Sequence, residues 1–172
     1  MTVSLIDLRE LSNPSKEQLS SLVEQHDAHI VIVVGHGTPN SVGSRKYGFT
    51  AETFPHFPSA KVIWLYACNC GTALITEIAK RGVTAFGYIT NVLAPATVES
   101  SVAHHIKNIV ERYSGDISPS ALLSYVQEEL FNNASTLLES ASDQTNGLFL
   151  FQASLINHTR LSLRFATTPC QA

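Results

Sequence analysis

Two stretches of the chain decide its fold: residues 30–37 read IVIVVGHG, and residues 62–71 read VIWLYACNCG. Each opens with five apolar residues rich in β-branched or aromatic side chains, the pattern of a strand buried on both faces of a sheet. Each then passes directly into turn-forming residues. A helical pattern at 72–81, closed by Gly82, separates the second stretch from a third apolar run at 83–89. Strand, helix and strand in this order predict a mostly parallel sheet.

The same alternation continues outward from these stretches. A strand is expected at 3–8, and a helix follows to about residue 24, opened by a capping box of Ser15 and Gln18. Residues 41–59 read as a structured loop with a small hairpin. The later segments are expected as helices at 95–112, 118–130 and on to about 140, and as strands at 147–155 and 161–165. No repeat or linker is visible, so residues 1–172 are expected to form one α/β domain with helices on both faces of its sheet.

Composition narrows the possible classes of function. Of the 172 residues, 44% are hydrophobic and 15% charged, which is typical of a compact globular chain. The net charge of −3 argues against nucleic acid as a partner. No apolar stretch approaches the ~18 residues of a membrane span. Because the three cysteines form no disulfide framework and the N-terminus lacks a signal-peptide pattern, we expect a reduced, cytoplasmic setting.

Two reactive residues follow the two deciding strands, His36 after the first and Cys68 after the second. The carboxyl ends of neighbouring parallel strands meet at one rim, so these side chains are expected to lie together. A thiol beside an imidazole is the arrangement for nucleophilic attack on an acyl carbon. The backbone amides of Gly37 and Cys68 are candidates for binding the oxyanion, and Gly71 permits the sharp turn into the next helix. The N-terminus of that helix is expected to favour the Cys68 thiolate.

These motifs, an apolar strand before His36-Gly37 and a second before Ala67-Cys68-x-x-Gly71, resemble the caspase-like cysteine peptidases, most closely the CHAT and separase-type branch. The resemblance covers about residues 15–112. It implies a caspase-like (haemoglobinase) three-layer sandwich and a thiol protease. Cys68 would be the nucleophile, His36 the base and Gly37 an oxyanion donor, acting on a protein or peptide substrate. By analogy, a regulatory partner protein would restrain it.

The chain departs from the family pattern in two places. The strand at 3–8 supplies less sheet before the histidine than the family has, so the sheet is either truncated or completed by a partner chain. Residues 90–95 carry no carboxylate, although the family usually has one there to recognise a basic substrate residue. Both departures favour an alternative hypothesis, a catalytically silent CHAT-like module that acts in binding or scaffolding.

The second cysteine of the motif, Cys70, leaves further alternatives open. It is expected as a small turn residue, but it is also a candidate redox partner of Cys68 in a Cys-x-Cys thiol oxidoreductase, or the true nucleophile. Cys68, Cys70 and His36 together provide only weak evidence for zinc. The acyl-transfer hypothesis needs no metal and no organic cofactor. The histidine at position 158 is expected to be an ordinary surface residue.

Overall fold

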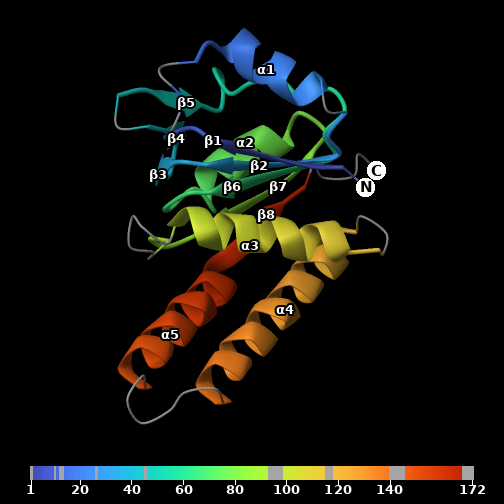
Figure 1. Cartoon of the computed structure of the whole chain (residues 1–172). Coiled ribbons are helices and arrows are strands. Elements are labelled where there is room, and N and C mark those ends of the chain that lie inside the picture. Colours follow the sequence, from blue (N-terminus) through green and yellow to red (C-terminus); the bar gives the residue numbers. More distant parts are fainter. Residues whose placement is uncertain are drawn as a thin grey trace.

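The computed structural model describes residues 2–9, 11, 14–25, 27–44, 46–92, 99–114, 118–139 and 146–167. In this part of the chain the protein is a mixed α/β structure with one five-stranded sheet, one small three-stranded sheet and five helices. The large sheet has the order β1-β2-β6-β7-β8 (Figure 1). Its first four strands are parallel, and β8 runs antiparallel to β7. The bounds of its strands are β1 Val3–Asp7, β2 Ile30–Val34, β6 Val62–Tyr66, β7 Thr84–Tyr88 and β8 Leu163–Ala166.

The two central strands confirm the buried-strand prediction. Every residue of β2 and of β6 is buried. Such strands need cover on both faces, and the helices provide it. Helices α1 (Lys16–Glu24) and α2 (Ala73–Ala79) lie on one face, and α3 (Glu99–Arg112) lies on the other (Figure 1). The predicted capping box of Ser15 and Gln18 opens α1.

Side chains of alternating strand positions divide the core into two clusters, one on each face of the sheet. Val31, Val33 and Leu65 pack with α1 and α2, whereas Ile32, Val34 and Trp64 pack with α3 and with helix α4 (Pro119–Glu139). This alternation is the two-residue period of a strand. The same alternation decides on which face of the sheet the side chains that follow each strand lie.

The expected hairpin within 41–59 is present as part of the small antiparallel sheet. That sheet consists of β3 (His36–Thr38), β4 (Ser41–Gly43) and β5 (Gly48–Thr50). Since β3 begins two residues after β2 ends, the small sheet extends directly from the carboxyl edge of the large one. His36 therefore lies at the junction of the two sheets.

The prediction of a strand at 147–155 is wrong. Residues Asn146–Ser162 form one helix, α5, which packs against α4 as a helical hairpin that extends away from the sheet (Figure 1). A short apolar run does not distinguish a buried strand from a buried helix by its period alone, and here the packing against α4 decides. The two consecutive helices expected from 118 onward are one helix, α4, because Leu122, Val126, Leu130 and Ala134 bury one continuous stripe.

The remaining predictions are close to the observed bounds. The helix expected from 95 runs from Glu99 to Arg112, and residues 95–98 lie outside the described part. Gly82, predicted to close α2, has a φ of 88°, the left-handed conformation that glycine favours. Among the described helices, none combines the length and the apolarity needed to cross a membrane.

Candidate functional site

The structure brings His36 and Cys68 to the same edge of the large sheet. In the parallel register of β2 and β6, Val34 lies opposite Tyr66, so His36 and Cys68 each follow two residues beyond a matched pair. The Gly35 amide donates a hydrogen bond of 3.3 Å to the Tyr66 carbonyl oxygen, which continues the ladder beyond β2. The expected juxtaposition at the carboxyl edge is confirmed by this register.

Gly37 holds the two segments in direct contact. A Cβ atom added to Gly37 would lie 2.1 Å from the Cys68 carbonyl oxygen, 2.8 Å from the Cys68 amide nitrogen and 2.6 Å from the Cys70 sulfur. No L-residue with a side chain fits there without displacing the backbone. The His-Gly motif is therefore a packing requirement: the glycine lets β3 lie against the turn that carries Cys68.

His36 and Cys68 share a small cavity of about 20 Å³, lined also by Val34, Tyr66 and Arg9. A space of this size admits a water molecule but no substrate side chain. The His36 side chain is exposed and Cys68 is half-buried. No hydrogen bond joins the imidazole to the thiol in the structure. The two residues line one cavity without a direct hydrogen bond between their side chains.

The two cysteines lie in different environments because Asn69 interrupts the strand alternation. Residues two apart on a strand point to the same face. Asn69 has a φ of 57°, a left-handed conformation that asparagine tolerates better than most residues. Cys68 therefore packs against the cluster on the α3 face, whereas Cys70 is fully buried in the cluster on the α1 and α2 face.

Burial removes Cys70 as a nucleophile. Desolvation, with a smaller contribution from the neighbouring Cys68, raises the pKa of the Cys70 thiol to about 12. Its sulfur donates a hydrogen bond of 3.4 Å to the Cys68 carbonyl oxygen. A protonated thiol inside the core does not attack an acyl carbon or a disulfide at neutral pH. Of the two candidates, Cys68 alone has access to the cavity and to solvent.

The turn that carries Cys68 is anchored to the end of β7. The Asn69 amide donates to the Thr90 carbonyl oxygen at 3.0 Å, and the Gly71 amide donates to the Tyr88 carbonyl oxygen at 2.8 Å. A Cβ on Gly71 would lie 2.6 Å from the Tyr88 carbonyl carbon, so the glycine is needed for this close approach, as expected from the sequence. These bonds occupy the amides of Asn69 and Gly71, which are therefore not available to a ligand.

The two amides expected to bind an oxyanion remain available. Thr38 and Ser41 pair across a two-residue turn, and the ladder alternates, so the amide of Gly37 points away from β4. The Cys68 amide has no hydrogen-bond partner within the described chain. Helix α2 begins at Ala73, close to the expected start, and its buried residues pack in the cluster on the face of the sheet opposite the Cys68 side chain.

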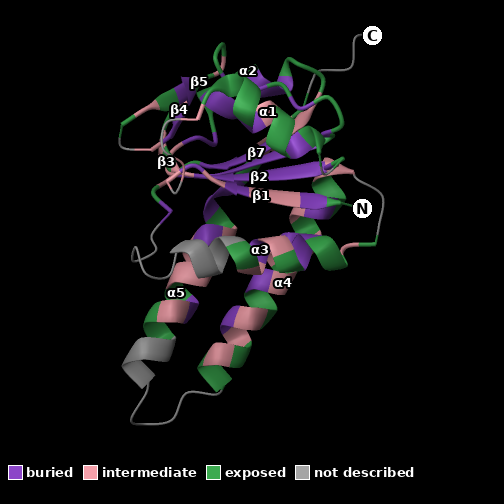
Figure 2. Ribbon diagram, turned by 45° about the horizontal axis from the view of Figure 1, so that its top comes forward, coloured by how far each residue is buried: buried purple, intermediate pink, exposed green. Residues whose placement is uncertain are grey.

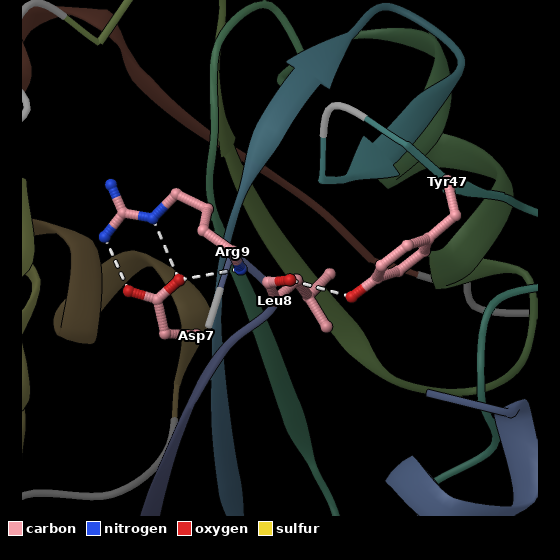
Figure 3. Close-up of polar contacts among 4 residues, drawn as sticks. All are labelled: Asp7, Leu8, Arg9 and Tyr47. Atoms are coloured by element: carbon pink, nitrogen blue, oxygen red, sulfur yellow. Dashed lines mark hydrogen bonds and ion pairs between the residues drawn. The ribbon is translucent and has the colours of Figure 1, made fainter. Parts of the chain in front are cut away.

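Arg9 is a site residue that the sequence analysis did not identify. It follows β1 at the same sheet edge and lines the cavity beside His36 and Cys68. Asp7 binds it through an Nε–Oδ1 hydrogen bond of 2.9 Å and an Nη2–Oδ2 ion pair of 2.5 Å (Figure 3). Burial alone would raise the pKa of Asp7, but the hydrogen bonds and charge of Arg9 outweigh it and lower the pKa. The Tyr47 hydroxyl donates to the Leu8 carbonyl oxygen at 2.7 Å and anchors the same segment (Figure 3).

His158, expected as an ordinary surface residue, instead joins α5 to this edge. Its Nε2 atom lies 3.0 Å from the Thr90 hydroxyl and 3.1 Å from the Asn91 carbonyl oxygen. The Asn91 Oδ1 atom accepts a hydrogen bond of 2.8 Å from the side-chain Nδ2 of Asn69. A chain of contacts thus runs from α5 to the residue beside Cys68. The sequence around position 158 does not predict this role, because the partners of His158 lie in a loop that is distant along the chain.

Other groupings of reactive side chains do not appear in the described residues. There, no three side chains of His, Cys, Asp or Glu are placed to hold a metal ion, and Cys68 and Cys70 are both free thiols. No protein-family model matches the chain, and no curated protein matches it either.

Proposed function

We propose that this protein is a cysteine peptidase in which Cys68 is the nucleophile and His36 the general base. The observation that carries this proposal is the contact of Gly37 with the Cys68 backbone, which sets an exposed imidazole and the only accessible described thiol around one cavity. The amide of Gly37, which faces away from β4, and the amide of Cys68, which has no hydrogen-bond partner in the described chain, are the proposed oxyanion donors for acyl transfer.

The proposed reaction uses these residues in two steps. His36 removes the proton from the Cys68 sulfur as the sulfur attacks the peptide carbonyl carbon, and the carbonyl oxygen becomes an oxyanion. When the carbon–nitrogen bond breaks, His36 donates that proton to the leaving amine, which leaves a thioester on Cys68. Water, deprotonated by His36, then hydrolyses the thioester and regenerates the thiol. No oxidant, metal or organic cofactor takes part.

The caspase-like architecture belongs to the same proposal. Its support is the strand order β1-β2-β6-β7 with all four strands parallel, combined with His36 after the second and Cys68 after the third of them. The proposal includes a restraining partner protein, since an unrestrained peptidase would damage the proteins around it, and a cytoplasmic location, which the free thiols of Cys68 and Cys70 would suit.

A catalytically silent binding module of the same fold is the second candidate function. Two observations favour it: the imidazole and thiol are not hydrogen-bonded, and their cavity of about 20 Å³ has no room for a substrate side chain. In this case the Gly37 contact is a structural feature alone. The thiol oxidoreductase has less support, because burial raises the pKa of Cys70 to about 12 and its side chain lies on the other face.

A covalent probe distinguishes the two candidates. The protein is incubated with peptidyl acyloxymethyl ketones that differ in the residue at the cleavage position, and the adducts are located by peptide mass spectrometry. The peptidase predicts one adduct, on Cys68, that is lost in Cys68→Ala and slowed at least tenfold in His36→Ala. Cys70→Ala serves as the matched control and should keep the adduct. An unreactive Cys68, or equal reaction in the His36 variant, would favour the silent module.

A further inference from the structure

β1 is an edge strand whose outer side carries no strand in the described chain. Two backbone hydrogen bonds show which residues face β2: the Thr2 carbonyl oxygen accepts from the Ile30 amide, and the Leu8 amide donates to the Val34 carbonyl oxygen. Backbone groups alternate in direction along a parallel strand, so the even-numbered residues of β1 bond to β2. The odd-numbered residues Val3, Leu5 and Asp7 therefore direct their N–H and C=O groups outward, away from the sheet.

A hollow of about 430 Å³ lies along this edge. It is lined by all five residues of β1, by Thr2 and Leu11, and by Leu22 and Val23 of α1. A second hollow of about 570 Å³ adjoins it over α1 and shares Leu11 and Leu22. In Figure 2, β1 lies between α1 and α3. Leu22 is 44% exposed at the rim of both hollows, although its neighbour Val23 is buried.

We propose that the outer edge of β1 binds an extended, uncharged segment of a partner protein, which adds a sixth strand to the sheet. Backbone groups of Val3, Leu5 and Asp7 would pair with the segment, and its alternate apolar side chains would fill the hollow beside Leu11 and Leu22. This is β-strand addition, in which the main chain supplies affinity and the pockets beside the edge supply selectivity. The site is independent of Cys68 chemistry and would exist equally in a peptidase or a silent module.

The chemistry of the hollow specifies this occupant. The backbone groups of an edge strand are best satisfied by another extended backbone. Asp7 is the one formally charged residue that lines the first hollow, and its carboxylate is already paired with Arg9. The first hollow therefore offers no unbalanced charge for a basic or acidic segment, and its walls of Leu11, Leu22 and Val23 favour aliphatic side chains; the charged residue of the second hollow, Glu17, lies on α1 away from β1.

A second copy of this chain fits the edge less well. Its own β1 would bring an identical hollow beside α1 to the interface, and two facing hollows leave the space between them unfilled. Unfilled apolar space forfeits the packing that stabilises an interface. A single strand from another protein has no such hollow beside it, so its side chains can fill the space next to β1. A partner segment is therefore the better occupant.

The test uses the intact protein and a synthetic nine-residue peptide whose seven central residues alternate valine and threonine; a lysine at each end, outside the uncharged pairing segment, keeps the peptide in solution. Amide exchange and chemical shifts are followed by NMR at peptide concentrations up to about 5 mM. In the free protein, the amides of Val3, Leu5 and Asp7 should exchange fast and those of Ser4 and Ile6 slowly. Saturating peptide should slow the odd-numbered amides at least tenfold and leave the even-numbered pair unchanged.

Two protein variants separate backbone pairing from side-chain contact. Leu5→Pro removes the outward N–H without touching the bonds to β2, whereas Leu5→Ala removes a similar amount of packing and keeps the N–H. Leu5→Pro should weaken peptide binding about five- to tenfold relative to Leu5→Ala, the effect of one lost hydrogen bond. Thermal unfolding of both variants checks that each is folded, and the exchange pattern of the unmodified protein does not depend on either.

Three results would overturn the proposal. One is the absence of saturable shifts at β1 with 5 mM peptide. Another is slowing of odd- and even-numbered amides alike, which would indicate contact without strand pairing. The third is a dimer in sedimentation of the free protein with Val3, Leu5 and Asp7 already protected, which would make a second copy the occupant. Loss of probe reactivity at Cys68 would leave the proposal untouched, since the two sites are tested separately.

Discussion

The substitution Gly37→Ala tests the geometry of the site most directly. The added methyl group would lie 2.1 Å from one backbone atom of Cys68, where ordinary contacts of such atoms begin near 3.4 Å. The nearest obstacles are backbone atoms and the sulfur of buried Cys70, so no flexible side-chain end can give way. Either β3 or the Cys68 turn must move by about 1 Å. Overpacking typically costs about 1–3 kcal/mol, and because the obstacles here are backbone atoms we expect a cost at the upper end, about 3 kcal/mol.

For a chain of this size, about 3 kcal/mol corresponds to a fall in melting temperature of roughly 6–12 °C. The assay is thermal unfolding monitored by circular dichroism, together with the rate at which Cys68 reacts with iodoacetamide. Gly48→Ala is the matched control from the same small sheet, because its added Cβ would have no neighbour closer than 3.7 Å. The control should stay within about 0.5 kcal/mol of the unmodified protein.

A Gly37→Ala protein that melts within 2 °C of the unmodified protein and reacts with iodoacetamide at the same rate would contradict this contact. Such a result would mean that the His36 strand does not lie against the Cys68 turn. The proposed dyad would then lose its geometric basis, whatever the reactivity of Cys68. A large loss of stability in Gly48→Ala would instead show that the small sheet tolerates no added side chain. The comparison of the two variants would then say nothing about the contact between Gly37 and the Cys68 turn.

Three further predictions follow from other contacts. Asp7→Asn should cost on the order of 1–2 kcal/mol at pH 7, measured by urea unfolding, because it removes the charge-assisted bonds to Arg9. Because the pKa of Asp7 is lowered in the folded state, this contribution is present above the unfolded pKa of about 4 and is lost as the pH falls through the folded pKa, so the unfolding free energies of the two proteins should converge as the pH is lowered further. Asn69→Ala should lower the free energy of unfolding by about 1–2 kcal/mol, because alanine is strained at a φ of 57°. Asn69→Gly should lower it by less, and equal decreases in the two variants would contradict the left-handed conformation. Tyr88→Phe should cost about 1–3 kcal/mol in thermal unfolding, because the buried Trp64 Nε1 loses its acceptor at 3.2 Å.

The sequence predicted those parts of the fold in which the type of each residue depends on its local environment alone. The strands Ile30–Val34 and Val62–Tyr66 are apolar at every position because every position is buried. The start of α1 was predictable because the capping box is local, and both of its hydrogen bonds lie within four residues. Local rules of this kind need no knowledge of the rest of the chain.

The failures have the opposite cause, since they depend on partners far away in the sequence. Residues 147–155 are apolar enough for a buried strand, and only their packing against α4 makes them helical. Arg9 enters the site because Asp7 holds it at the edge where His36 and Cys68 lie. His158 binds the loop at Thr90, nearly seventy positions away in sequence. The sequence around these residues contains no pattern that predicts contacts with partners so distant along the chain.

The choice between Cys68 and Cys70 shows how one backbone angle determines the chemistry that a motif can perform. Cysteines two positions apart on a regular strand would share a face, and both thiols would be exposed or both buried. The left-handed turn at Asn69 sends Cys70 into the core, where burial raises its pKa to about 12, and leaves Cys68 beside His36. A Cys-x-Cys disulfide becomes unfavourable for the same reason that a single nucleophile becomes possible. The buried thiol then has a structural role: it fills the space under Gly37, the residue through which the histidine strand reaches the Cys68 turn.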